Sequence, residues 1–395
     1  MITPGTAPSG SARPPAVVEG TGSRYRPGEI MINTADVERA SGVLATLGAV
    51  RDQRLDPALR PYVTRYLVPA GTDTLAVIKR VRAASAERPV RVGANHVFAG
   101  EPVYQGGPGS PPAPARAITE PATPTGVGTG ARVAVLDTGV AADAQRRHPL
   151  LGHRYLAAQG DIDPLDTDRP ADGLDDQAGH GTFVAGIIAM LAPEAGLIPI
   201  RVLSSDGLTD EITVALGLLR AAEAGADVIN LSLGGYTEDD QAPVVLEAVL
   251  DRLDPGIAVV AAAGNAGSRR LFWPAAFKRV LAVAALDTTR GRCVPAPFSN
   301  HGWWVDACAP GTRVRSCFVA GKRVAEDHSV VAFDGYASWD GTSFAAPHVA
   351  AMIARRVGTG LPAAMAAAEL LTDAKADRLP GYGVVLRPAT DLVNV

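Results

Sequence analysis

Apolar residues recur along the chain with two different spacings, and these spacings predict its strands and helices. Five mostly apolar runs indicate strands of a parallel sheet that is buried on both faces. They lie near residues 131–137, 197–203, 227–233, 257–263 and 280–285. Apolar residues three and four apart predict helices near 180–190, 210–224, 240–253 and 343–356. Together these elements indicate an α/β domain, a doubly wound mainly parallel sheet, over residues 131–395.

A smaller unit of different character is predicted ahead of this domain, over residues 25–104. Its first predicted helix carries Val37, Ala40, Leu44 and Leu47 on one face, as a helix packed on a sheet should. The predicted elements are strands at Glu29–Asn33, Val63–Val68 and Val90–Phe98 and helices at Asp36–Leu47 and Asp73–Ala84. This alternation indicates a small α+β domain.

Two further segments lack such periodicity. Residues 1–24 are rich in Gly, Pro, Ser and Ala, and we expect them to be disordered. Residues 105–130 carry prolines at 108, 111, 112, 114, 121 and 124. This composition predicts an extended, protease-sensitive linker between the two domains.

Three polar residues stand at the ends of predicted elements. Asp137 ends an apolar strand, at the sheet edge where α/β proteins place ligands. His180 opens one helix and Ser343 opens another, where unpaired N–H groups favour developing negative charge. Each alone could be an ordinary turn or capping residue. Together they supply an orienting carboxylate, a base and a nucleophile, in the chain order Asp, His, Ser.

The blocks around these residues resemble the subtilisin family of serine proteases, the subtilases. The matching blocks are Asp137-Thr138-Gly139, His180-Gly181-Thr182, Ala261–Gly267 and Gly341–His348. The resemblance covers residues from about 125 to 395. Phe183 departs from it, because the family often has a second histidine there. That position has no role in proton transfer, so the departure does not argue against activity.

The resemblance implies a role for each residue. Ser343 would attack the peptide carbonyl, His180 would take and return its proton, and Asp137 would orient the imidazole. Asn265 would join the backbone N–H of Ser343 in stabilising the oxyanion, although a plain turn asparagine is the alternative. No thiol lies in these blocks.

The resemblance also implies a place for substrate. Ser232, Leu233 and Gly234 would offer a free backbone edge to an extended peptide. Ala262, Ala263 and Gly264 would flank the pocket for the residue before the cleaved bond. Phe272 and Trp273 fall near the floor of that pocket, where they could narrow it or simply pack in the core.

By resemblance, residues 25–104 are an inhibitory pro-domain that assists folding and acts as an intramolecular partner. Its C-terminal end would then lie in the cleft as a product strand. Self-cleavage would be expected around Pro102–Gly106. An unrelated α+β adaptor domain remains the alternative.

Composition limits the other possibilities. The net charge of −4 and the lack of a basic stripe argue against a nucleic-acid partner. No apolar run reaches the length that spans a bilayer, so no membrane partner is expected. The N-terminus has neither a basic nor an apolar signal region, and we expect a cytoplasmic protein, with export by another route left open.

Cysteines and acidic residues leave questions open. The three cysteines are an odd number, and Cys317 could pair with Cys308 or with Cys293. The segment before His180 contains Asp161, Asp163, Asp166, Asp168, Asp172, Asp175 and Asp176. It could be a solvated loop, a calcium site or an acidic rim facing substrate, with Asp176 the best candidate for such a charge. The spacing fits no calcium loop, so no cofactor is assigned, and calcium stays possible.

The sequence therefore predicts a serine endopeptidase acting on peptides or proteins, with a precursor-processing protease as the narrower interpretation. A catalytically silent, peptide-binding homologue is the alternative, although no site residue is missing. An α/β-hydrolase esterase is excluded, because it would need Gly-x-Ser-x-Gly with the serine first in chain order.

Overall fold

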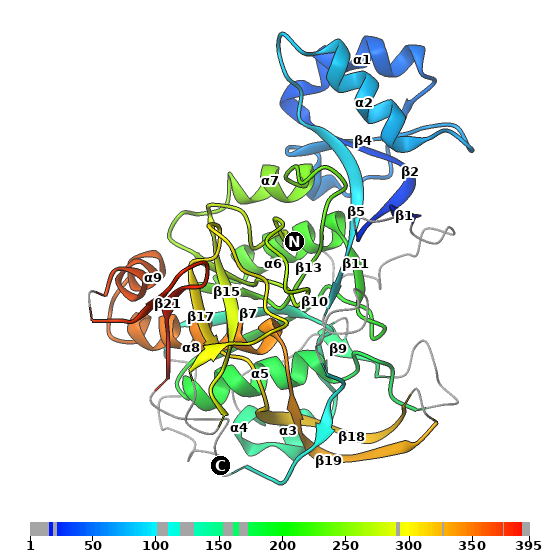
Figure 1. Cartoon of the computed structure of the whole chain (residues 1–395). Coiled ribbons are helices and arrows are strands. Elements are labelled where there is room, and N and C mark those ends of the chain that lie inside the picture. Colours follow the sequence, from blue (N-terminus) through cyan, green and yellow to red (C-terminus); the bar gives the residue numbers. More distant parts are fainter. Residues whose placement is uncertain are drawn as a thin grey trace.

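The protein is described by a computed structural model (Figure 1). The described residues are 16–18, 22–100, 110–118, 130–152, 161–165, 173–289, 293–325, 328–373 and 375–388.

A largely parallel sheet forms the centre of the larger domain, in the strand order β10-β7-β12-β14-β15-β17-β21-β20. Neighbours from β10 to β21 run parallel. β20 pairs antiparallel with β21 at one edge, and the short β16 pairs antiparallel with the C-terminal end of β15. The strands are β7 (Arg132–Asp137), β10 (Gly196–Arg201), β12 (Val228–Leu231), β14 (Ala258–Ala262), β15 (Val280–Asp287), β16 (Val294–Pro295), β17 (Ala307–Pro310), β20 (Arg378–Leu379) and β21 (Gly383–Val385).

Helices cover both faces of this sheet, because successive side chains of each strand point to opposite faces. Val133 and Val135 of β7 join the core beneath α5 (His180–Leu191) and α8 (Thr342–Val357). Ala134 and Leu136 join the opposite core, beneath α6 (Glu211–Glu223) and α7 (Val244–Leu250). The expected doubly wound α/β architecture is confirmed.

Smaller elements complete this domain. A long hairpin, β18 (Val314–Val324) and β19 (Val330–Trp339), packs against α5. The remaining elements are β8 (Val140–Ala141), β9 (Ile162–Asp163), β11 (Leu208–Asp210), β13 (Leu233–Gly234), α3 (Ala144–Arg147), α4 (Pro149–Gly152) and α9 (Ala363–Thr372). Among the helices of the described segments, none has the length and apolar character to cross a membrane.

The N-terminal unit is a small α+β domain, as expected. A sheet in the order β5-β2-β4-β3 is covered by two helices, whose residues Ala40, Leu44 and Ile78 form a separate core with it. The elements are β1 (Ala16–Val18), β2 (Ser23–Asn33), α1 (Val37–Thr46), β3 (Val50–Arg51), β4 (Val63–Leu67), α2 (Thr74–Ala84) and β5 (Val92–Gly100). Short 3-10 turns lie at Thr34–Asp36 and Pro57–Leu59.

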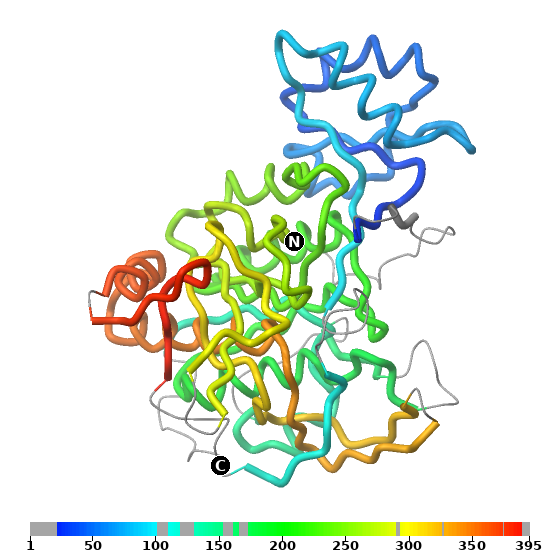
Figure 2. The backbone as a smooth tube through the Cα atoms, viewed as in Figure 1, coloured from blue at the N-terminus to red at the C-terminus, as the bar shows by residue number. Residues whose placement is uncertain are grey.

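The two domains share one strand. β5 leaves the N-terminal unit and pairs antiparallel with β11 and β13 of the larger domain, as the cyan strand of Figure 1 shows. After a gap in the described residues, β6 (Ala113–Pro114) pairs with β19 (Figure 2). The chain between the domains therefore follows the surface of the larger domain on both sides of this gap.

One expectation about the connecting segments needs revision. Part of residues 1–24 is ordered, since β1 pairs with β2 through Ala16 and Tyr25. Within the predicted linker, Trp339 Nε1 donates to the Ser110 carbonyl at 2.7 Å, which ties this residue to the larger domain. The expected self-cleavage region, Pro102–Gly106, lies outside the described residues.

Candidate active site

Asp137 is the last residue of β7 and is fully buried. Its Oδ1 accepts from the Thr138 backbone N–H at 2.8 Å and from His180 Nδ1 at 2.7 Å. The carboxylate therefore fixes which ring nitrogen of His180 carries the proton toward it. It leaves the other nitrogen, Nε2, available for a different partner.

Two glycines position His180 at the first turn of α5. Gly179 has φ of +80°, and a Cβ there would lie 2.8 Å from Phe318. A Cβ on Gly181 would lie 2.1 Å from the Gly139 carbonyl, so only glycine lets α5 approach the end of β7 this closely. His180 Nε2 is buried and has no hydrogen-bond partner in the described parts of the chain.

Ser343 is the second residue of α8 and is fully buried. Its Oγ donates to the Ser232 carbonyl at 3.2 Å, and Ser232 Oγ donates back to the Ser343 carbonyl at 2.7 Å. The hydroxyl is therefore turned toward the segment after β12 and makes no hydrogen bond to His180 Nε2.

Asn265 follows β14 and faces the start of α8. Its Oδ1 accepts from both the backbone N–H and the hydroxyl of Thr342, each at 2.9 Å. These two donors fix the orientation of the amide, so that Nδ2 is the atom left without a partner among the described residues. A Cβ on Gly341 would lie 3.2 Å from this Nδ2, which places the N–H donor beside the Gly341–Ser343 turn.

Aromatic side chains surround the His180 ring. Trp339 meets it edge-on at 5.3 Å between centroids, and Phe344 lies at 5.3 Å in a tilted arrangement. Phe183 packs against both of these rings and is fully buried. The position where the family often has a second histidine is thus filled by an apolar aromatic contact. Trp339 was missed at the sequence level, because its place in a hairpin gives no periodic signal.

The expected substrate edge is occupied by the chain itself. Leu233 pairs with Gly100, and Gly234 pairs with Ala99, both in antiparallel register. On the other side β5 pairs with β11, and the Gly100 N–H donates to the Gly207 carbonyl at 2.8 Å. The groove between β11 and β13 thus binds an extended strand on both of its edges.

Phe272 fills the space beside this groove. A Cβ on Gly234 would lie 2.3 Å from one edge of its ring, and a Cβ on Gly264 would lie 3.0 Å from the other edge. The ring is therefore wedged between the Ser232–Gly234 and Ala262–Gly264 segments. Trp273 bridges to Gly235 and packs on Phe277 at 4.5 Å, so it belongs to the core instead.

The acidic segment before His180 is largely paired. Asp176, the candidate for a charge facing substrate, forms an ion pair with Arg323 at 2.8 Å, so its charge is balanced within the larger domain. Asp161 pairs with Arg220 at 2.7 Å, and Asp175 accepts from Ser205. Asp166, Asp168 and Asp172 lie outside the described residues. Within the described ranges no three His, Cys, Asp or Glu side chains form a metal-binding group.

Asp163 is a buried carboxylate next to the Asp137–His180 pair. It accepts from the Thr138 hydroxyl and the Gly179 backbone N–H, each at 2.8 Å. Burial, with a contribution from the nearby Asp137 charge, raises the pKa of Asp163 to about 7. Asp163 therefore braces the two turns that carry Asp137 and His180.

All three cysteines are free, so neither disulfide considered from the sequence is formed. Burial raises the pKa of the Cys308 thiol to about 12, which keeps it protonated and unreactive.

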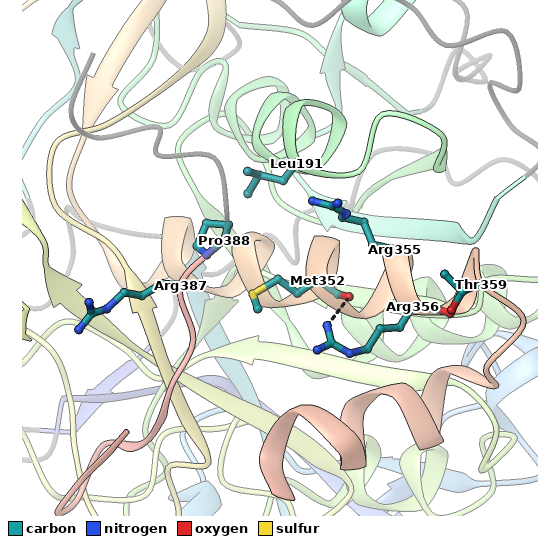
Figure 3. Close-up of a pocket in the computed structure, with 7 residues that line it drawn as sticks. All are labelled: Leu191, Met352, Arg355, Arg356, Thr359, Arg387 and Pro388. Carbon is teal, nitrogen blue, oxygen red and sulfur yellow. Dashed lines mark hydrogen bonds between the residues drawn. The ribbon is translucent and has the colours of Figure 1, made fainter. Parts of the chain in front are cut away.

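A pocket of about 270 Å³ lies at the far ends of α5 and α8 (Figure 3). It is lined by Leu191, Met352, Arg355, Arg356, Thr359, Arg387 and Pro388. Leu191 is the last residue of α5 and His180 is the first, so the pocket lies about 16 Å along the helix from the candidate site. It is not part of that site.

Comparison with known proteins places this geometry in a family. Residues 128–383, more than half of the chain, match the subtilase family. Thermitase of Thermoactinomyces vulgaris is 35% identical over 266 residues, 65% of this chain and 84% of thermitase. Subtilisin BL of Lederbergia lenta is 36% identical over 232 residues, 56% of this chain and 74% of that protein.

A solved structure shares the fold more widely. The crystal structure of fervidolysin from Fervidobacterium pennivorans, a keratinolytic enzyme related to subtilisin, has a TM-score of 0.62 at 20% identity. The likeness covers 96% of this chain and 63% of fervidolysin. Because the family match extends over most of the domain that carries the candidate site, the chain belongs to the subtilase family of serine endopeptidases.

Proposed function

We propose that Ser343 is the nucleophile, His180 the general base and acid, and Asp137 the group that orients the imidazole. The observation that carries this proposal is the buried 2.7 Å hydrogen bond between Asp137 Oδ1 and His180 Nδ1. It holds the tautomer in which Nε2 can accept the serine proton. A buried ring nitrogen without a partner otherwise costs stability, which is expected at a catalytic position.

In this proposal a rotation of Ser343 moves its Oγ from the Ser232 carbonyl to His180 Nε2. Catalytic hydrogen bonds are often absent from the resting enzyme and form with bound substrate. The freed Ser232 carbonyl then accepts from the N–H of the residue before the cleaved bond, which continues the antiparallel pairing of β13. Since every required group is present, a catalytically silent homologue is not favoured.

Asn265 is proposed to stabilise the oxyanion with its Nδ2–H, which has no partner among the described residues.

Asn265→Ala should lower kcat by about 10²–10³-fold with little change in KM, because the donor acts mainly on the transition state. Labelling of Ser343 by a fluorophosphonate probe should slow as well, and mass spectrometry would map the label. Asn300→Ala is not a suitable control, since Asn300 supports the same turn through Ala266 and Ser268. Asn33→Ala, which removes an amide that caps a turn of the N-terminal domain away from the groove-bound end of β5, is the matched control. Equal kcat in the Asn265→Ala variant and the wild type would contradict the role.

Phe272 is proposed to restrict the residue before the cleaved bond to small side chains. Its ring stands between the two backbone segments that flank this residue's pocket in the family. Such restriction supports selective action, as on a precursor peptide, over general digestion.

Removing the Phe272 ring tests whether it restricts the side chain of the residue before the cleaved bond. Phe272→Ala should raise the kcat/KM ratio of Phe-containing to Ala-containing peptides at that position by about tenfold or more, since it leaves room for a ring. Folding must be checked by thermal melting, because removing a buried Phe typically costs about 3–5 kcal/mol. Phe277→Ala removes a neighbouring ring outside the glycine segments and should leave the ratio as in wild type. A ratio that does not move in Phe272→Ala would refute the assignment.

The N-terminal domain is proposed to be an intramolecular inhibitor. Support comes from β5, which occupies both edges of the groove that a substrate would use. Support also comes from the chain that follows. Ser110 accepts from Trp339, whose ring contacts His180, and β6 pairs with β19. The same surface would then serve inhibition and catalysis.

A further inference from the structure

His96 of β5 is buried between two carboxylates of the larger domain. Its Nδ1 lies 2.5 Å from Glu211 Oε1, and its Nε2 lies 2.9 Å from Glu238 Oε2. Burial alone would lower the pKa of His96, but the hydrogen bonds and charges of the two glutamates outweigh it and raise the pKa to about 9. Since ionised carboxylates only accept, both ring nitrogens donate and the ring is an imidazolium.

This cation sits at a defined position of the groove-bound strand. Val97 pairs with Asp210, so His96 reaches the first residue of α6, Glu211. Gly100, four residues after His96, pairs with Leu233. A peptide bound in this register places its next residue opposite Ser232, beside Ser343. If that residue is counted as the first and the count runs toward the N-terminus, the position of His96 is the sixth.

The two carboxylates belong to the larger domain, and Glu211 is held there without β5. Glu211 Oε2 accepts from the Val245 backbone N–H at 3.0 Å, which fixes its side chain before any strand binds. Glu238 lies in the loop after β13 and is nearly buried in the occupied groove. Two neighbouring carboxylates repel each other and favour binding of a cation between them.

We infer that Glu211 and Glu238 form an acidic subsite for substrate, which binds a basic side chain six residues before the cleaved bond. The inference rests on the proposed function and adds a sequence requirement to it. In the described structure His96 occupies the subsite as the substrate residue would. The ligand class is a peptide with Arg, Lys or His at this position, followed by a small residue at the position of Gly100.

Other acid–base contacts between the domains do not involve the groove strand. Asp239 pairs with Arg82 of α2, and Asp210 pairs with Arg26 of β2 at 3.3 Å. These contacts can dock the N-terminal domain, but a peptide lying in the groove would not reach them. Asp239, which directly follows Glu238, is therefore a matched control for a general effect of charge.

Paired peptides test the subsite. They carry the sequence of residues 95–100 followed by three alanines, with Arg, His or Gln in place of His96, and mass spectrometry locates the cleaved bond. With the full chain, kcat/KM for the Arg and His peptides should exceed that for the Gln peptide by about tenfold or more. All peptides compete equally with β5, so the ratio reports the subsite. Glu238→Gln should reduce the ratio at least about threefold, and Asp239→Asn should keep it.

A ratio near one in the wild type, or one that Glu238→Gln leaves unchanged, would overturn the subsite while the protease assignment stands. If no peptide is cleaved and Ser343 takes no fluorophosphonate label, the proposed function fails instead. The subsite is then decided by hydrogen–deuterium exchange in the Ser343→Ala chain. His96→Gln should speed exchange at residues 97–100 about tenfold, and His96→Lys should restore most of the protection. Equal loss of protection in both variants would show that the site does not select a cation.

Discussion

Ser343→Ala is expected to abolish peptidase activity, with a loss on the order of 10⁶-fold in kcat, which is typical of the nucleophile in a subtilisin triad. The substitution removes the proposed nucleophile at the start of α8. His180→Ala should lose about as much, because the members of such a triad act as one unit. Hydrolysis of a quenched peptide and fluorophosphonate labelling would measure both variants.

The fold should survive this change. Ser343 Oγ makes one hydrogen bond, to the Ser232 carbonyl, so its loss should cost only about 1 kcal/mol of stability. Ser41→Ala, at an exposed hydroxyl of α1, is a matched control that should keep full activity. Near wild-type hydrolysis by the Ser343→Ala variant would mean that the nucleophile has been misassigned.

Long elements of the fold could be predicted because their apolar patterns are strong. The runs that became β7, β14 and β15 are apolar on both faces, as buried parallel strands require. Other elements could not be predicted. β17 is only Ala307–Pro310, β21 is Gly383–Val385, and the β18–β19 hairpin mixes charged residues with apolar ones. Segments this short or this mixed carry no recognisable period.

The candidate site was accessible to sequence reasoning for a related reason. Asp137, His180, Ser343 and Asn265 each follow or open a strongly periodic element, and the structure brings these ends together. The subsite was not accessible, because His96 lies 115 residues from Glu211 and 142 from Glu238 in the chain. Only the pairing of β5 with β11 and β13 makes them neighbours. Phe272 was noticed, but its wedge between two glycines is a property of the packed structure.

The chain is expected to cut itself between about residues 103 and 132, after which the N-terminal domain is free to dissociate. Because Gly100 pairs with Leu233 in the bound register, bonds in this range reach Ser343 only if the strand shifts in the groove or a second molecule makes the cut. The unprocessed protein should hydrolyse added peptide about 100-fold more slowly than the processed one. The reason is that a tethered strand competes at an effective concentration in the millimolar range. Mass spectrometry over time would follow loss of the 40.7 kDa chain, and Ser343→Ala should stay intact.

The contacts between the domains explain why cleavage alone need not give full activity. Arg26–Asp210, Arg82–Asp239 and His96 between its two glutamates would still hold the cleaved domain in place. Activity should therefore rise further as the released domain is diluted or degraded, and more readily in a His96→Gln chain, which lacks the central cation. A wild-type chain that stays intact yet fully active would rule out inhibition. Residues 25–104 would then be a permanent accessory domain. Because β5 would have to leave the groove for each substrate, a peptide would need to match the register of β5 to displace it, and this would select the substrate.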